Sequence, residues 1–124
     1  MREGKSTLLR LRRFKTIQND KVELLERMMT EFKKMAAGLA AEVAAEEDRT
    51  RNKDIGHFAY STFAKAAALR RRNLMISVTD IQSRLDVAKR ELDEVTVQLR
   101  DLELVQSPTR SSTHSLGEVE KRIS

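Results

Sequence analysis

Few residues in this sequence have the types and spacing that chemistry requires. The run Gly4-Lys5-Ser6-Thr7 matches the last letters of a phosphate-binding loop. The full motif places another glycine five residues earlier and a strand before it. Only three residues precede Gly4, so we expect no nucleotide-binding loop at this position.

The other candidates for catalysis or metal binding do not converge. His57 and His114 are the only histidines, and the chain has no cysteine. No carboxylate accompanies either histidine at ligand spacing on one helix, so we predict no metal site. Glu46, Glu47 and Asp48 are consecutive, and on a helix they would point in different directions instead of meeting at one substrate. The sequence therefore predicts no enzyme, no cofactor and no small-molecule substrate.

The composition is typical of long helices that bury a narrow apolar seam. Charged residues make up 35% of the chain and aromatic residues only 4%, with one proline and four glycines. Such a mixture suits helices whose remaining surface is solvated. No stretch approaches the roughly 18 consecutive apolar residues of a membrane span, and the N-terminus lacks the apolar run of a secretory signal. We therefore expect a cytoplasmic protein.

The clearest pattern predicts a coiled-coil helix from about residue 58 to about residue 106. Apolar residues alternate spacings of four and three over four heptads; they are Leu74, Val78, Ile81, Leu85, Ala88, Leu92, Val95, Leu99 and Leu102. Extended backward, this register includes Ala67, Ala64 and Tyr60, with one polar exception at Arg71.

A less regular pattern predicts a first helix from about residue 6 to about residue 48. One four-three register passes through Leu11, Phe14, Leu25, Met28, Phe32, Met35 and Leu39, and it is interrupted at Gln18, Lys21 and Glu42. Further apolar residues widen this stripe on its flanks; they are Ile17, Leu24, Met29, Ala36 and Val43. A stripe of this width can bury more than one neighbouring element.

The segment from residue 49 to residue 57 predicts a loop between the two helices. It has no apolar period and contains Asn, Asp and Gly, which favour turns, and Ser61 or Asp54 could cap the second helix. A reversal near residue 53 pairs residues whose numbers sum to about 106. We thus predict an all-α antiparallel coiled-coil hairpin over residues 1–106. Residues 107–124, rich in hydroxyl groups after Pro108, are predicted to form a disordered tail.

Positive charge is concentrated at the N-terminus, where residues 1–15 carry six cations and one acid. A basic end favours anionic partners such as nucleic acid, lipid head groups or an acidic protein surface. Arg10, Arg12 and Arg13 are therefore candidate partner-binding residues. Arg70 and Arg72 belong to a second basic cluster that either stays solvated along the helix or meets an acidic partner.

Two stretches carry a resemblance to a known family. Leu8-Leu9-Arg10-Leu11-Arg12-Arg13-Phe14-Lys15 opens the first helix, and His57-Phe58-Ala59-Tyr60-Ser61-Thr62-Phe63-Ala64-Lys65-Ala66-Ala67 follows the loop. Together they resemble the alphaproteobacterial branch of the flagellar type III export protein FliJ family, over about residues 5–105. The second stretch is the more specific of the two. Its aromatic residues, Phe58, Tyr60 and Phe63, would either close the loop or contact a partner.

The resemblance implies a coiled-coil stalk of the flagellar export apparatus. Such a stalk binds the hexameric export ATPase, links it to the membrane-embedded export gate and handles export chaperones, on the inner face of the cell membrane at the flagellar base. A coiled-coil adaptor of another assembly, or a nucleic-acid-associated protein that uses its basic N-terminus, is the alternative. Nucleic acid is the less favoured partner, because Leu8, Leu9, Leu11 and Phe14 occupy much of the surface from which a DNA-binding helix would read bases.

Overall fold

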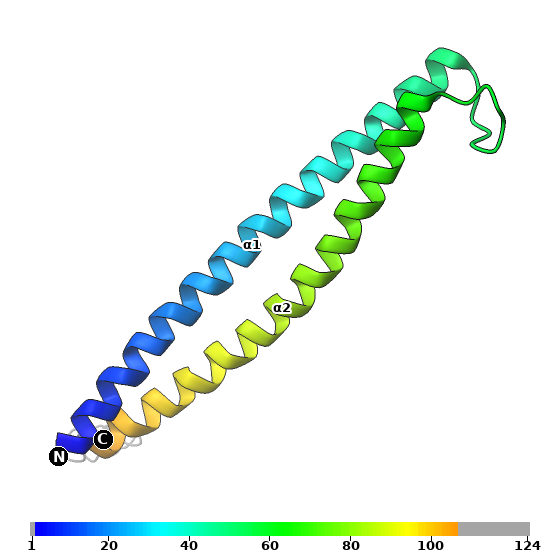
Figure 1. Ribbon diagram of the computed structural model, residues 1–124. Helices are drawn as coiled ribbons and strands as arrows, with labels where there is room; N and C mark the ends of the chain where they lie inside the picture. Colours follow the sequence, from blue (N-terminus) through cyan, green and yellow to red (C-terminus); the bar gives the residue numbers. More distant parts are fainter. Residues whose placement is uncertain (1, 107–124) are drawn as a thin grey trace, which may run out of the picture. The chain divides into compact units, whose positions relative to one another are not determined.

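The structure, a computed structural model, describes residues 2–106, except for the side chains of Arg2 and Glu3. Helix α1 spans Arg2–Thr50 and helix α2 spans Thr62–Gln106. The two helices pack against each other as a hairpin (Figure 1), so the predicted all-α fold is confirmed. The tail predicted at residues 107–124 lies outside the described residues.

The packing divides into two units, each of which contains a segment of both helices. We call Val22–Val87 the loop unit, because it contains the connection between the helices. We call the described part of the other unit, residues 2–21 and 88–106, the terminal unit. Each unit is described by itself below.

The seam of α2 follows the predicted heptads. In the loop unit its buried residues are Ala64, Ala67, Val78, Ile81 and Leu85, and in the terminal unit they are Ala88, Val95 and Leu99. Leu74, Leu92 and Leu102 are half-buried at the remaining positions. Arg71, the polar exception, is exposed. An uninterrupted four-three alternation was therefore sufficient to identify the face of this helix that packs.

The seam of α1 differs from the predicted one at every second position. Leu25 and Leu39 are buried as expected. The next buried residue after Leu25 is Met29, four positions later, and not the predicted Met28, three positions later. Met29 is only 6% exposed and Ala36 is also buried, whereas Met35 is 52% exposed. The predicted seam positions Phe14, Met28 and Met35 therefore lie on the flank, and the predicted flank residues Met29, Ala36 and Val43 lie in the seam.

Charge explains why α1 packs on this face. The predicted register would place Lys21 and Glu42 against α2, and burying an unpaired charge is costly. The observed register places Val22 and Val43 there, and both Lys21 and Glu42 are exposed. The face with fewer charges is the one that packs.

The helix ends also differ from the prediction, because two local motifs set them. Arg51 has a left-handed backbone conformation (φ 59°), and the N–H of Asn52 donates to the carbonyl of Glu47 at 3.2 Å. This is the Schellman arrangement that ends a helix, and it ends α1 at Thr50. The observed loop therefore begins two residues later than predicted.

Helix α2 begins at Thr62 because Ser61 is its N-cap. The N–H of Ala64 donates to Ser61 Oγ at 3.1 Å, which satisfies a backbone donor that the first helical turn leaves unpaired. Asp54, the other capping candidate, instead accepts from the N–H of Gly56 at 3.1 Å within the loop. Helix α2 therefore starts four residues later than the predicted residue 58.

Net charge of opposite sign on the two helices favours their antiparallel pairing. In the loop unit, α1 carries seven acids and four bases, whereas α2 carries five bases and two acids. In the terminal unit the signs are reversed, with seven bases and two acids on α1 and three bases and five acids on α2. Each unit thus pairs a basic segment with an acidic one, which lowers the electrostatic energy of this arrangement.

Candidate partner-binding surfaces

The three N-terminal arginines do not form one cluster. Arg12 Nη2 donates to Glu103 Oε2 of α2 at 3.1 Å in an exposed ion pair. Arg10 and Arg13 lie three positions apart, so they share a face of α1 that Arg12 does not. Arg10 donates to Thr7 Oγ1 at 3.3 Å, and Arg13 is exposed. Of the three, only Arg10 and Arg13 share a face of α1, and this face is not the one that carries the Arg12–Glu103 ion pair.

Exposed apolar side chains accompany these two arginines. Phe14 and Ile17 follow Arg10 and Arg13 at helical spacing, and Ile17 is 61% exposed. We call these four residues the N-terminal face. Arginine and aromatic side chains are enriched where protein interfaces gain most of their energy. The N-terminal face therefore has the composition of a protein-binding surface.

Arg12 instead lines a small groove within the terminal unit. The groove has a volume of about 330 Å³, and its lining residues are Arg12, Lys15, Thr16, Asn19 and Leu99. Its cations belong to α1 and its one apolar residue to α2. Arg12 thus takes part in a contact between the two helices of this unit, through an exposed ion pair.

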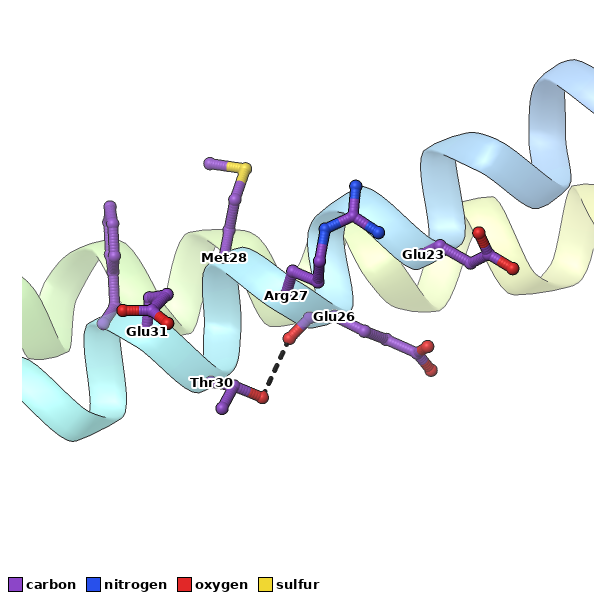
Figure 2. Close-up of a pocket in the computed structure, with 7 residues that line it drawn as sticks. Glu23, Glu26, Arg27, Met28, Thr30 and Glu31 are labelled. Atoms are coloured by element: carbon purple, nitrogen blue, oxygen red, sulfur yellow. Dashed lines mark hydrogen bonds between the residues drawn. The ribbon is translucent and has the colours of Figure 1, made fainter.

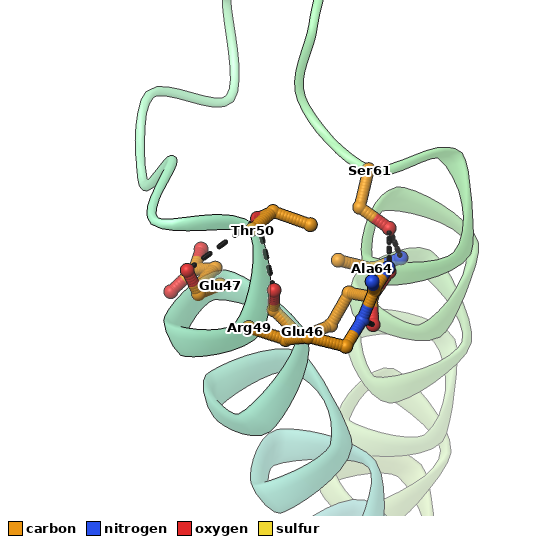
Figure 3. Close-up of polar contacts among 6 residues, drawn as sticks. All are labelled: Glu46, Glu47, Arg49, Thr50, Ser61 and Ala64. Carbon is orange, nitrogen blue, oxygen red and sulfur yellow. Dashed lines mark hydrogen bonds and ion pairs between the residues drawn. The ribbon is translucent and has the colours of Figure 1, made fainter.

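A polar network closes the hairpin at the loop (Figure 3). Glu46 of α1 accepts two hydrogen bonds from Arg49, at 2.9 and 2.7 Å, and a third from Ser61 Oγ at 2.7 Å. Ser61 is the N-cap of α2, so Glu46 holds the cap in place from the other helix. The hydrogen bonds from Arg49 and then from Ser61 lower the pKa of Glu46 to about 2.

Tyr60 belongs to the same closure and is not part of an exposed surface. It is 8% exposed, and its hydroxyl donates to Glu47 Oε2 at 2.7 Å. That hydrogen bond, together with burial and the negative charge of Glu47, raises the pKa of Tyr60. Of the two alternatives for Tyr60, closing the loop or contacting a partner, its burial and its hydrogen bond to Glu47 favour the first.

The other two aromatic candidates remain available to a partner. Phe58 is 96% exposed, and its ring stacks on the imidazole of His57 with the centroids 4.6 Å apart. Phe63, in the first turn of α2, is also exposed. The interpretation that these rings close the loop does not apply to Phe58, because hardly any of its surface is covered.

Arg70 and Arg72 lie in different grooves of the loop unit. Arg72 and Lys65 border a groove of about 540 Å³ that we call the loop groove, which is lined by Ile55, Thr62, Lys65, Ala66, Ala68, Leu69 and Arg72. Among residues 2–106, no acid lines it, and Ile55 and Leu69 are both more than half exposed. Ile55 and Leu69 are not among the predicted partner-binding residues, because neither lies on the heptad seam.

Arg70 borders a second groove, which lies between the helices. We call it the interhelix groove; its volume is about 680 Å³, and it is lined by Phe32, Met35, Gly38, Leu39, Glu42, Arg70, Asn73, Leu74 and Ser77. Residues two positions apart point to different sides of a helix, which is why Arg70 and Arg72 do not lie on one surface.

A shallow surface hollow on α1 does not have the features of an active site. Its lining residues, from Glu23 to Phe32, all belong to α1. Figure 2 shows Met28 and Arg27 on one side of the ribbon, while Thr30 turns its hydroxyl to the carbonyl of Glu26 at 3.1 Å. Within the described part of the chain, no second element contributes a group that could meet these side chains over a substrate.

Two further features are absent from the part of the chain that the structure describes. Within residues 2–106, no group of three or more His, Asp or Glu residues is placed to hold a metal ion. Over the same residues, neither helix contains a stretch long and apolar enough to cross a membrane. Comparison with known proteins gives no matching family model, no matching curated protein and no matching solved structure.

Proposed function

We propose that this chain is a non-enzymatic coiled-coil hairpin that acts by binding proteins, as the stalk of a flagellar type III export apparatus. In this proposal it binds the hexameric export ATPase and links it to the export gate and to export chaperones. The observation that carries the proposal is the N-terminal face, where Arg10, Arg13, Phe14 and Ile17 are exposed although the seam of α1 is already covered by α2.

The N-terminal face supports binding of an acidic or polar protein surface. Its two arginines are on the same side of α1, and the neighbouring apolar side chains can be buried by a partner. Arginine pairs well with carboxylates at interfaces because its planar guanidinium donates in a fixed geometry. In the arrangement that the family resemblance implies, the end that holds the chain termini enters the ATPase ring, and the N-terminal face would meet the residues lining that ring.

The loop unit supports the linking role, because a linker needs a second surface that does not compete with the first. Phe58 and the loop groove supply exposed apolar groups, and Lys65 and Arg72 add positive charge beside them. We assign the gate or chaperone contact to this surface. The stretch His57–Ala67, which carries most of the family resemblance, covers Phe58 and part of the loop groove, together with the cap at Ser61.

The experiment that tests the proposal is a binding titration between the purified chain and the cognate export ATPase. The variant Arg10→Glu/Arg13→Glu should bind at least tenfold more weakly at low salt, because like charges would then meet across the interface. The matched control is Lys33→Glu/Lys34→Glu, which changes the net charge equally at two exposed positions of the loop unit. Circular dichroism should show the same helix content in all three proteins.

The outcomes separate the competing functions. Normal ATPase binding by the Arg10/Arg13 variant would show that the N-terminal face has been assigned to the wrong partner. Equal loss of binding in both variants would indicate a nonspecific charge effect. A wild-type chain that ignores the ATPase but binds duplex DNA with a steep salt dependence would reject the stalk in favour of the nucleic-acid alternative.

A further inference from the structure

The interhelix groove of the loop unit leaves part of the hairpin's own seam uncovered. Phe32 and Leu74 are seam residues of α1 and α2, yet each is only half-buried, and both line the groove. Met35 lies beside them and is largely exposed. Two helices alone cannot enclose side chains of this size on both sides. The groove therefore has an apolar floor that continues directly from the packed interior.

The rim of this groove carries one charge of each sign. Glu42 comes from α1 and Arg70 from α2. Among residues 2–106, neither side chain takes part in an ion pair. Both charges are thus exposed and available beside an apolar surface.

Helix α1 extends the apolar surface along the loop unit. Leu24, Met28 and Met35 lie on one flank of α1, where the exposed Glu31 separates Met28 from Met35, and Leu24 and Met35 are among the exposed large apolar residues. Gly38 continues the same row, and a Cβ placed on it would have no neighbour within 4 Å. Nothing within the hairpin requires a glycine at this position, and its lack of a side chain permits close approach of another backbone.

We propose that this face, formed by the interhelix groove and the row Leu24, Met28 and Met35, is where a second copy of this chain docks with twofold symmetry. In a twofold interface both subunits use the same surface patch, so the patch must be complementary to itself. The groove meets this requirement, because Glu42 of each copy can pair with Arg70 of the other. The apolar floors of the two grooves then cover each other.

The distribution of charge distinguishes this face from the loop groove. The loop groove has only cations on its rim, Lys65 and Arg72, so a twofold self-interaction there would bring like charges together. The interhelix groove has the mixed pair that a self-complementary interface needs. This inference does not depend on the flagellar assignment, because it concerns only the residues of the loop unit.

The test uses charge reversal in the full-length chain, with sedimentation velocity over a range of concentrations as the readout. The wild type should show a reversible monomer–dimer equilibrium. Glu42→Arg and Arg70→Glu should each weaken dimerisation by about 100-fold, because two like-charge contacts replace two favourable ones in every dimer. Arg71→Glu is the matched control, since Arg71 is exposed next to Arg70 but does not line the groove.

Mixing the two single variants gives the sharpest outcome. In the mixed dimer the introduced arginine meets the introduced glutamate, and the native Glu42 meets the native Arg70, so an equimolar mixture should dimerise like the wild type. The double variant Glu42→Arg/Arg70→Glu should also dimerise. If the double variant recovers but the mixture does not, the two residues act within one chain, and the proposal fails.

Two further results would also overturn it. One is a wild type that sediments as a monomer at every concentration at which it stays in solution. The other is a Met35→Lys variant that keeps normal helix content and dimerises as well as the wild type, because that would show that the apolar floor is not buried. Circular dichroism on each variant separates loss of association from loss of folding.

Discussion

Replacing two adjacent methionines tests which face of α1 packs against α2. Met29 lies in the observed seam and Met28 on its flank, so Met29→Ala should destabilise the hairpin far more than Met28→Ala. The two substitutions change helix propensity by the same amount. The difference between them therefore reports burial alone.

The size of the effect follows from how much surface each side chain loses to the fold. Met29 is almost completely buried, and substitution of a buried methionine by alanine costs about 2–5 kcal/mol. The seam of a two-helix hairpin has solvent on both sides and can relax around a cavity, so the lower end of that range, about 2 kcal/mol, applies. Met28 is partly exposed, and its loss should cost less than about 1 kcal/mol.

Urea unfolding followed by circular dichroism at the helical minimum measures both values. The protein should be dilute enough that copies do not associate. In thermal unfolding, Met29→Ala should lower the midpoint by roughly 10 °C, at about 4–8 °C per kcal/mol for a domain of this size. If Met28→Ala proves as destabilising as Met29→Ala, the register with Met28, Met35 and Glu42 in the seam is correct and the observed one is wrong.

Two further predictions concern the loop and its closure. Arg51→Gly should stabilise the chain by about 1 kcal/mol, because glycine adopts the left-handed conformation of Arg51 without steric cost. Chemical denaturation will measure this change, and a loss of stability would mean that the Arg51 side chain is itself required. Stability should also fall as the pH drops from about 4.5 to about 2, because folding lowers the pKa of Glu46 and the folded state therefore favours the ionised carboxylate over that range. Glu46→Gln should flatten this part of an acid titration, and an unchanged acid profile would show that the hydrogen bonds from Arg49 and Ser61 add no stability.

The face of α2 was predictable because its sequence offers no competing choice. Apolar residues occur at every seam position from Leu74 to Leu102, and the residues on either side are largely polar. Tyr60 also falls on the backward extension of this register, but it precedes Thr62, the first residue of α2, so the helical period does not account for its burial. Its hydrogen bond to Glu47 belongs to the closure of the loop.

The face of α1 was ambiguous because apolar residues occur at both the third and the fourth position after Leu25. Periodicity cannot separate Met28 from Met29, since steps of three and four are equally helical. The cost of burying Lys21 and Glu42 does separate them, and that information is present in the sequence. Apolar spacing alone is therefore insufficient to choose the packing face of α1, and the positions of the charges are needed as well.

The polar contacts between the two helices, unlike the packing faces, could not be predicted from the sequence. The sequence places Arg10, Arg12 and Arg13 together at a basic end, but of the three only Arg12 pairs with Glu103 of α2. The hydrogen bonds that close the loop were not predicted either: Ser61 donates to Glu46, and Tyr60 donates to Glu47. These contacts depend on the register between two helices and on small rotations of each about its axis. Neither quantity can be read from one segment alone.

The sequence by itself determined two long helices, the reversal between them and the packing face of α2, because these follow from local preferences and from an unbroken apolar period. Only the tertiary structure decided which side of α1 is covered, which arginines are already paired and which apolar residues remain exposed. The physical reason is that the free energy of a side chain at these positions depends on the facing helix. Which residue of the facing helix a given side chain meets is decided only when the chain has folded back on itself.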